Sequence, residues 1–144
     1  MVKLLQCVAG LAIAFLLGIT APAVAQRGSG AALFAKVTQL FQAGNYSEAL
    51  PLAQRLVAIA EREGGPNHPN VATALIVLAA IYEAQARYAD AEQAYKRALA
   101  IYEKANGPEH PQVADALARL ARLHVSEGRY NDAEPLAQRS LAIR

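Results

Sequence analysis

The sequence is poor in several residue types on which particular functions depend. It has one cysteine (Cys7), one methionine and no tryptophan among 144 residues. Its 14 lysine and arginine residues nearly balance 12 aspartate and glutamate residues, giving a formal charge of +2. Nucleic-acid binding usually needs a concentrated basic face, so no nucleic-acid partner is expected. Alternating β-branched runs are absent as well, and the alanine- and leucine-rich composition favours helices over strands.

The first 25 residues have the pattern of a secretory signal peptide. Lys3 supplies a positive start, and the run at 8–19 (VAGLAIAFLLGI) is apolar. Ala23 and Ala25 then stand at the small-residue positions of a cleavage site before Gln26. We therefore expect export, to the periplasm or out of the cell. The alternative is an uncleaved membrane anchor, because 8–25 nearly reaches spanning length.

Removal of residues 1–25 would leave a mature chain without cysteine. Such a chain forms no disulfide, no thiolate metal site and no cysteine nucleophile. Its formal charge would be +1, since Lys3 is the only charged residue in the removed segment. Stability outside the cytoplasm would then have to come from apolar packing.

What the sequence has in abundance is internal repetition. The stretch GGPNHPNVATAL (64–75) returns 42 residues later as NGPEHPQVADAL (106–117). Three further segments, at 44–61, 86–103 and 128–144, align without a gap and share a tyrosine at their third position. A fixed period in this range is typical of a solenoid, in which each unit buries its apolar face on its neighbours.

Each repeat is expected to contain two helices. In the middle copy, apolar residues recur at helical spacing over about 71–85 and again over about 89–105. Acidic residues crowd the start of each second helix, where the helix dipole favours them. The short turn between the two helices carries Gly44 or Gly128, with Ala86 in that place in the middle copy.

The middle repeat matches the tetratricopeptide consensus at eight positions: Leu75, Leu78, Ala79, Tyr82, Tyr88, Ala91, Tyr95 and Ala98. Together with the 42-residue period and the GPxHP connector, it resembles the kinesin-light-chain-type tetratricopeptide repeats common in bacteria. The resemblance implies an all-α fold, a right-handed α-solenoid of antiparallel helix pairs with about three repeats. These would span about 31–64, 72–106 and 114–144, after a linker at 26–30 that contains Gly-Ser-Gly.

The outer repeats depart from the middle one. Lys36 stands where the other copies have Leu78 and Leu120, which is typical of an N-terminal cap with one face in water. The third copy stops at Arg144, and this is expected to leave the apolar side of the last helix pair uncovered. Two structural alternatives therefore stay open. Copies of the chain self-associate by stacking, or the chain is a fragment of a longer solenoid attached to a missing effector domain.

The repeated His-Pro pair has a structural interpretation. The glycines before it suit the turn that ends a helix, and a proline suits the first position of the next helix. His68 and His110 are therefore expected to bond the connector or cap that helix. A shared metal ion is the alternative, but equivalent positions in adjacent repeats lie about 10 Å apart, too far for two imidazoles to share one zinc. His124 shares a column with Tyr82 and Leu40 and is expected to pack in the core.

No catalytic constellation is present. The serines that remain after residue 25 lie in neither a nucleophile elbow nor an S-x-x-K pattern. A glycine-rich phosphate loop is also missing. We therefore predict a non-enzymatic protein with no cofactor, no metal site and no small-molecule substrate.

In the family that the chain resembles, first helices line a concave groove that binds protein or peptide partners. The resemblance therefore implies a protein–protein interaction scaffold. Relatives often place asparagines on these helices, whereas Ile76-Val77 and Ala118-Arg119 stand here, so apolar contact is expected to contribute more. The predicted groove residues are Phe34, Thr38, Phe41, Thr73, Ile76, Ala80, Glu83, Asp115, Ala118, Arg122 and Val125.

Overall fold

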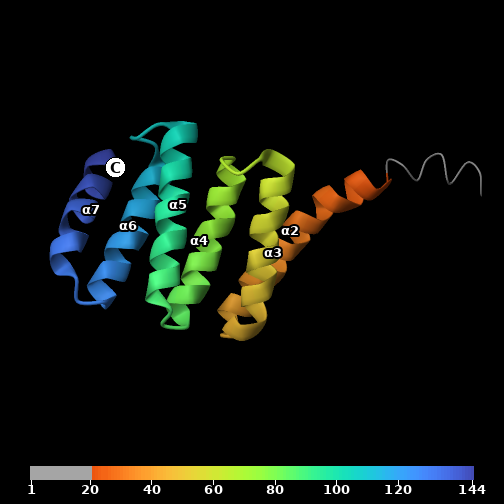
Figure 1. Cartoon of the computed structure of the whole chain (residues 1–144), viewed down its shortest axis with the longest axis horizontal. Helices are drawn as coiled ribbons and strands as arrows, with labels where there is room; N and C mark the ends of the chain where they lie inside the picture. The colour runs from red at the N-terminus through yellow and green to blue at the C-terminus, as the bar shows by residue number, and fades with distance from the viewer. Residues whose placement is uncertain (1–20) are drawn as a thin grey trace, which may run out of the picture. The chain divides into compact units, whose positions relative to one another are not determined.

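The computed structural model describes residues 21–144, with side-chain surroundings from residue 29 onward. Within this range the chain forms helices and turns and no strand, which confirms the all-α class (Figure 1). The predicted signal peptide lies outside the described residues except for 21–25. In chain order the helices are α2 (Ala21–Gln42), α3 (Tyr46–Gly64), α4 (Pro69–Ala84), α5 (Tyr88–Asn106), α6 (Pro111–Ser126) and α7 (Tyr130–Ile143).

Helix α2 begins earlier than expected. Residues 26–30 lie inside it, so the predicted linker is wrong for this segment. Each of the two glycines, Gly28 and Gly30, disfavours a helix by about 1 kcal/mol relative to alanine. Alanine is frequent on both sides of them, however, and it is the strongest helix former. The chain divides into two compact units, Met1–Ala32 and Leu33–Arg144.

In this second unit each helix packs against the next one in the chain. Helix α3 contacts α4, α4 contacts α5, α5 contacts α6 and α6 contacts α7. Figure 1 shows them side by side with alternating direction, from α3 in yellow to α7 in dark blue. The core runs along the whole row, from Val37 and Leu40 of α2 to Leu123 of α6. Tyr95 is the largest fully buried side chain of this core.

The first helices α4 and α6 begin at the repeated His-Pro pair. The ring Nδ1 of His68 accepts a hydrogen bond of 3.1 Å from the backbone N–H of Asn70. His110 accepts an equivalent bond of 3.2 Å from Gln112. Each histidine is therefore the N-cap of its helix, with proline at the first helical position. The prediction of a structural role for both histidines is confirmed.

The turn inside each repeat has the same backbone conformation in all three copies. Gly44 and Gly128 have φ angles of 78° and 74°, and Ala86 has a φ angle of 58° in the equivalent place. The second helices α3 and α5 likewise end at glycines of positive φ, Gly65 and Gly107. Alanine at position 86 thus adopts a left-handed conformation that favours glycine.

Candidate partner-binding groove

The first helices of the three repeats border one hollow of about 270 Å³ on the unit Leu33–Arg144. Helices α2, α4 and α6 all contribute side chains, and one tyrosine comes from the start of α5. We name this hollow the central groove. Its lining residues are Phe41, Ala80, Glu83, Ala84, Tyr88, Arg122 and Ser126.

The charged part of the central groove is a hydrogen-bonded network. The carboxylate Oε2 of Glu83 accepts bonds from the Tyr95 hydroxyl at 3.0 Å and from Arg122 Nη2 at 3.2 Å. Burial, together with the charge of Glu83 and its hydrogen bond, raises the pKa of Tyr95 to about 12. Tyr95 is fully buried, whereas the Arg122 side chain is 61% exposed. Glu83 is thus held by a hydrogen bond from the core, whereas Arg122 is largely in contact with water.

Four of the predicted groove residues line this hollow: Phe41, Ala80, Glu83 and Arg122. Phe41 also packs edge-on against Tyr46, with ring centroids 5.4 Å apart. Tyr88 was not predicted, although it belongs to the repeated tyrosine column. The tyrosine column is visible in the aligned repeats and could have drawn attention to Tyr88. Sequence spacing alone, however, does not show that this column lies beside the first helices.

Other predicted groove residues are engaged elsewhere. Ile76 is 9% exposed and belongs to the core, so it offers little surface to a partner. Thr73 bonds the Tyr102 hydroxyl at 3.0 Å, and Asp115 pairs with Arg119 at 2.9 Å. Toward the start of the unit, Phe34 is 39% exposed. The Thr38 hydroxyl donates a hydrogen bond to the backbone carbonyl of Phe34.

A second, larger hollow of about 490 Å³ lies between α6 and α7, and we name it the end groove. The predicted residues Ala118, Arg122 and Val125 are part of its lining. Val125, Tyr130 and Leu141 are 47%, 66% and 73% exposed. The full lining is Ala118, Ala121, Arg122, Val125, Tyr130, Ala133, Glu134, Ala137, Ser140, Leu141 and Arg144.

Comparison of equivalent positions explains why the end groove is apolar. Ala137 occupies the column of Ala53 and Tyr95, both completely buried. Leu141 occupies the column of Val57, which is buried, and of Leu99, which is partly buried. Helices α3 and α5 each pack against the first helix that follows them, α4 and α6. On α7 the same columns are exposed, and they form the apolar lining of the end groove.

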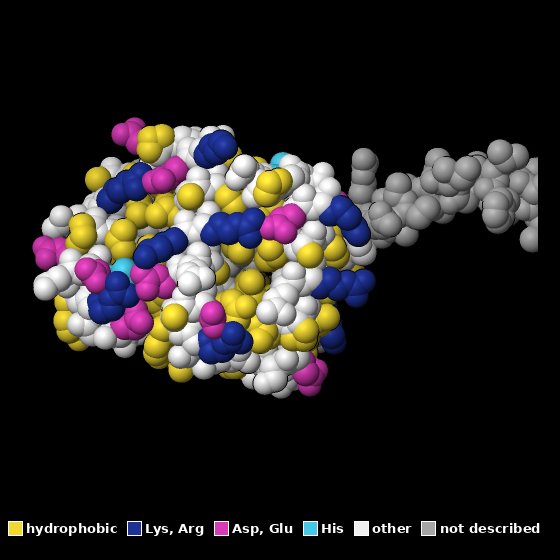
Figure 2. All heavy atoms as spheres, in the orientation of Figure 1, with side chains coloured by type: hydrophobic (Ala, Val, Ile, Leu, Met, Phe, Trp, Pro, Cys, Tyr) yellow, Lys and Arg dark blue, Asp and Glu magenta, His cyan; other side chains and the backbone are white. Residues whose placement is uncertain are grey.

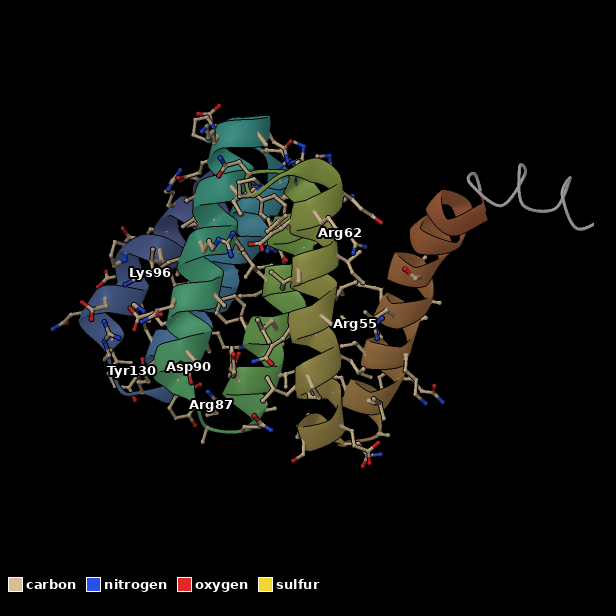
Figure 3. The ribbon with its side chains drawn as sticks, turned by 45° about the vertical axis from the view of Figure 1, so that its right-hand side comes forward. Arg55, Arg62, Arg87, Asp90, Lys96 and Tyr130 are labelled. Atoms are coloured by element: carbon tan, nitrogen blue, oxygen red, sulfur yellow. The ribbon has the colours of Figure 1, made fainter. Side chains whose placement is uncertain are left out.

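Figure 2 shows one face of the molecule, on which basic and acidic side chains alternate over apolar surface. Ion pairs within and between helices account for much of this pattern. The guanidinium carbon of Arg87 lies 4.5 Å from the centre of the Tyr82 ring. Arg87 also forms an ion pair of 2.7 Å with Asp90, and Figure 3 labels both residues. Arg97 of α5 pairs with Glu61 of α3, so ion pairs also bridge the second helices.

One set of side chains among the described residues offers three metal-ligand atoms close together, although the sequence predicts no metal site. These atoms belong to Glu92, His124 and Glu127 and lie within 4.8 Å of one another. His124 is 4% exposed, which confirms its predicted place in the core.

None of the helices in residues 21–144 has the length and apolar character needed to cross a bilayer.

Paired helices in a row, with a 42-residue period, define a helical-repeat solenoid. The family model of the tetratricopeptide repeat matches residues 30–104 and 94–144. The chain therefore belongs to the tetratricopeptide repeat family. Among curated protein sequences, none matches it.

Solved structures with this fold include BtubC and a putative kinesin light chain. BtubC (BKLC) from P. vanneervenii is 25% identical with a TM-score of 0.71, over 75% of this chain and 42% of that one. A putative kinesin light chain with nearly identical TPR-like repeats from Podospora anserina is 26% identical with a TM-score of 0.70, over 78% and 53%. This chain thus spans about half the length of either protein.

The TPR domain of Arabidopsis FLU shares the fold at 15% identity. Its TM-score is 0.71, and the match covers 81% of this chain and 95% of that domain. Folds of this family generally serve as scaffolds for protein–protein interaction. The family thus defines a broad class of function, while the partner depends on the particular surface.

Proposed function

We propose that this chain is a non-enzymatic scaffold that binds a segment of another protein in the central groove. The observation that carries the proposal is the composition of that groove. The apolar and aromatic lining consists of Phe41, Ala80, Ala84 and Tyr88, and Arg122 adds an exposed cation beside it. Such a site suits a segment that presents an apolar side chain next to a carboxylate.

The charge network explains the preference for a carboxylate. When Arg122 turns toward a ligand, Glu83 keeps its hydrogen bond from the buried Tyr95. The groove then loses an ion pair in which the Arg122 side chain is 61% exposed and the Glu83 side chain is 17% exposed. A carboxylate on the partner could then replace Glu83 as the acceptor for Arg122, while Glu83 stays bound to Tyr95.

The test is a charge reversal with a matched control. Arg122→Glu places two acids side by side in the central groove. Arg97→Glu creates the same repulsion with Glu61 on the second helices. We expect cross-linked capture of the partner to fail with Arg122→Glu and to persist with Arg97→Glu. Equal capture by both variants would show that the central groove is not the binding site.

We further propose that the chain acts outside the cytoplasm, after cleavage before Gln26. The support is the sequence of residues 1–25, with Lys3, an apolar run and a small-residue exit. N-terminal sequencing of the protein from the native host tests this directly. A chain that begins at Gln26 agrees with the proposal, and one that keeps residues 1–25 favours the membrane anchor.

A second candidate function is structural, and the end groove favours it. Val125, Tyr130 and Leu141 expose apolar area at positions bordering the surface on which a following first helix would pack. In a head-to-tail arrangement the end groove of one copy would meet α2 of the next, where Lys36 is exposed in a column that is leucine in the other repeats. Because a lysine opposes burial in an apolar contact, two copies are better suited to meet through their end grooves.

Sedimentation tests this second candidate. Self-association of the wild-type chain should increase with concentration, and Leu141→Lys should abolish it because a charge would be buried in the contact. Arg97→Glu is again the control, since it changes charge away from the end groove. A wild-type chain that stays monomeric at high concentration contradicts this candidate and leaves the central groove unaffected.

A further inference from the structure

A buried histidine without a hydrogen bond lies beside two acids where α5 meets α6. His124 of α6 is 4% exposed, and its Nε2 lies 3.4 Å from Oε1 of Glu92 on α5. Neither ring nitrogen makes a hydrogen bond among the described residues. A buried polar atom without a partner costs about 1–3 kcal/mol, so a ligand that completes this site would recover that energy.

The column of His124 shows what the repeat does elsewhere at this position. Tyr82 stands there in α4, and its hydroxyl accepts a hydrogen bond of 3.2 Å from Gln54 of α3. Leu40 stands there in α2 and has no polar atom to satisfy. In the other two repeats, the side chain at this position therefore either has its polar group hydrogen-bonded or has no polar group. His124 is the exception, and its ring is directed at a carboxylate.

The two acids form a cluster with three charged neighbours. Glu92 pairs with Lys96 at 2.6 Å through Oε1 and with Arg129 at 2.9 Å through Oε2. Arg129 also pairs with Glu127 at 3.2 Å and with Asp132 at 2.9 Å. The hydrogen bond from Lys96, reinforced by Arg129 against the effect of burial, lowers the pKa of Glu92 to about 2. Both carboxylate oxygens of Glu92 thus already contact cationic side chains.

We propose that Glu92, His124 and Glu127 bind one divalent transition-metal ion, best fitted by Zn²⁺. This inference is independent of the central groove and of its partner. One imidazole with two carboxylates matches the ligand preference of zinc, whereas calcium and magnesium favour sites made of oxygen alone. Three protein ligands leave a fourth tetrahedral position for water.

The geometry requires only small side-chain movements. Ligand atoms around zinc at about 2.0–2.2 Å stand roughly 3.4 Å apart, and the three atoms here already lie within 4.8 Å of one another. Glu127 closes the distance most easily, because it stands at the C-cap of α6. Its side chain is only 22% exposed, so the ion would be partly shielded from water.

Lys96 and Arg129 compete with the metal for the same carboxylates. Lys96 projects from α5, where Figure 3 labels it, and its side chain is 59% exposed, so it returns to water easily. We therefore expect opposite effects of Lys96 on metal binding and on the stability of the fold. Removal of the Lys96 charge should tighten metal binding, although loss of an ion pair would by itself only weaken the fold.

The experiment is a calorimetric titration of the metal-free full chain with ZnCl₂. A Cys7→Ser background removes the only thiol in the sequence. The test variants are His124→Leu, which restores the residue type of Leu40 in that column, Glu127→Gln and Lys96→Gln. The control is His110→Asn, which removes another imidazole but keeps an N-cap acceptor.

We expect one ion per chain, bound at least about tenfold more weakly by His124→Leu and by Glu127→Gln. Lys96→Gln should bind about two- to fivefold more tightly, corresponding to release of an exposed ion pair. His110→Asn should bind as the background does. Absence of binding, binding that His124→Leu and Glu127→Gln both leave unchanged, or weaker binding by Lys96→Gln would overturn the proposal. If His124→Leu does not fold, as judged by circular dichroism, Glu127→Gln decides.

Discussion

The three histidines of the described chain differ in what their ring nitrogens contact. His68 and His110 each accept a hydrogen bond from a backbone N–H two residues later. His124 is buried beside Glu92 and makes none. The repeated histidines stand in loops before a proline, whereas His124 stands in a helix column that faces the core. Position in the repeat therefore determines whether a histidine caps a helix or is buried without a hydrogen bond.

A single alanine offers the clearest residue-scale prediction. Ala86 has a φ of 58°, whereas glycine occupies the equivalent position in the other repeats. Ala86→Gly should raise the free energy of unfolding by about 0.5–1 kcal/mol, because glycine avoids the left-handed penalty but loses more chain entropy. Urea denaturation measures this change.

Gly128→Ala is the matched control for this prediction. Its φ is 74°, and an added Cβ would meet nothing within 4 Å, so only the backbone conformation is changed. We expect destabilisation of about 1 kcal/mol. A stabilising Gly128→Ala together with a destabilising Ala86→Gly would contradict the account of this turn.

Glu92 gives a prediction for stability against pH. Its pKa is about 2 in the folded chain against 4.5 for a free glutamate, so the carboxylate stabilises the fold at pH values above 4.5. This contribution is lost as the pH falls from 4.5 to about 2. Glu92→Gln should therefore flatten the loss of stability in that window, measured as the urea midpoint with a chelator present. An unchanged acid dependence in the variant would show that Glu92 is not stabilised in this way.

At the scale of the helix, the boundaries depend on a few residues that are readable in the sequence. Periodicity predicts 71–85 and 89–105 in the middle repeat, and the helices span Pro69–Ala84 and Tyr88–Asn106. The first helix starts two residues earlier because His68 caps it and Pro69 occupies its first position. Local signals of this kind could be predicted because they act within a few residues of chain.

The errors at this scale have a common physical origin. The Gly-Ser-Gly segment was predicted as a linker, yet α2 runs through it, since two glycines do not outweigh the surrounding alanines. Ile76 was predicted to face the groove and is buried instead. Helical periodicity indicates a direction for each side chain, but how far the neighbouring helix covers it depends on packing across the repeats.

The N-caps give the prediction for this scale. His110→Ala removes the acceptor for the Gln112 N–H and should cost about 1 kcal/mol of unfolding free energy. His110→Asn should restore most of that loss, because asparagine is a strong N-cap residue. Thermal or urea unfolding of the two variants measures the difference. Equal stability of His110→Ala and the wild type would contradict the capping role.

At the scale of the whole unit Leu33–Arg144, the repeats form two hollows of different character. The central groove is bordered by three first helices and contains the pair Glu83–Arg122. The end groove is apolar and sits on the last helix pair. Part of the lining of the first hollow could be predicted, because helical periodicity indicates which residues of the first helices lie outside the core. The second required the structure, which shows Val125, Tyr130 and Leu141 exposed together.

The most direct test of the central claim is a photo-reactive residue placed on each face of the solenoid. Ala84 lines the central groove, and Ala100 of α5 is an exposed alanine on a second helix. Both positions therefore tolerate a larger side chain. In the presence of the partner protein isolated by the cross-linked capture, we predict a covalent adduct between that partner and position 84 and none with position 100. An adduct from position 100 and none from position 84 would show that the partner binds the second helices and would contradict the account.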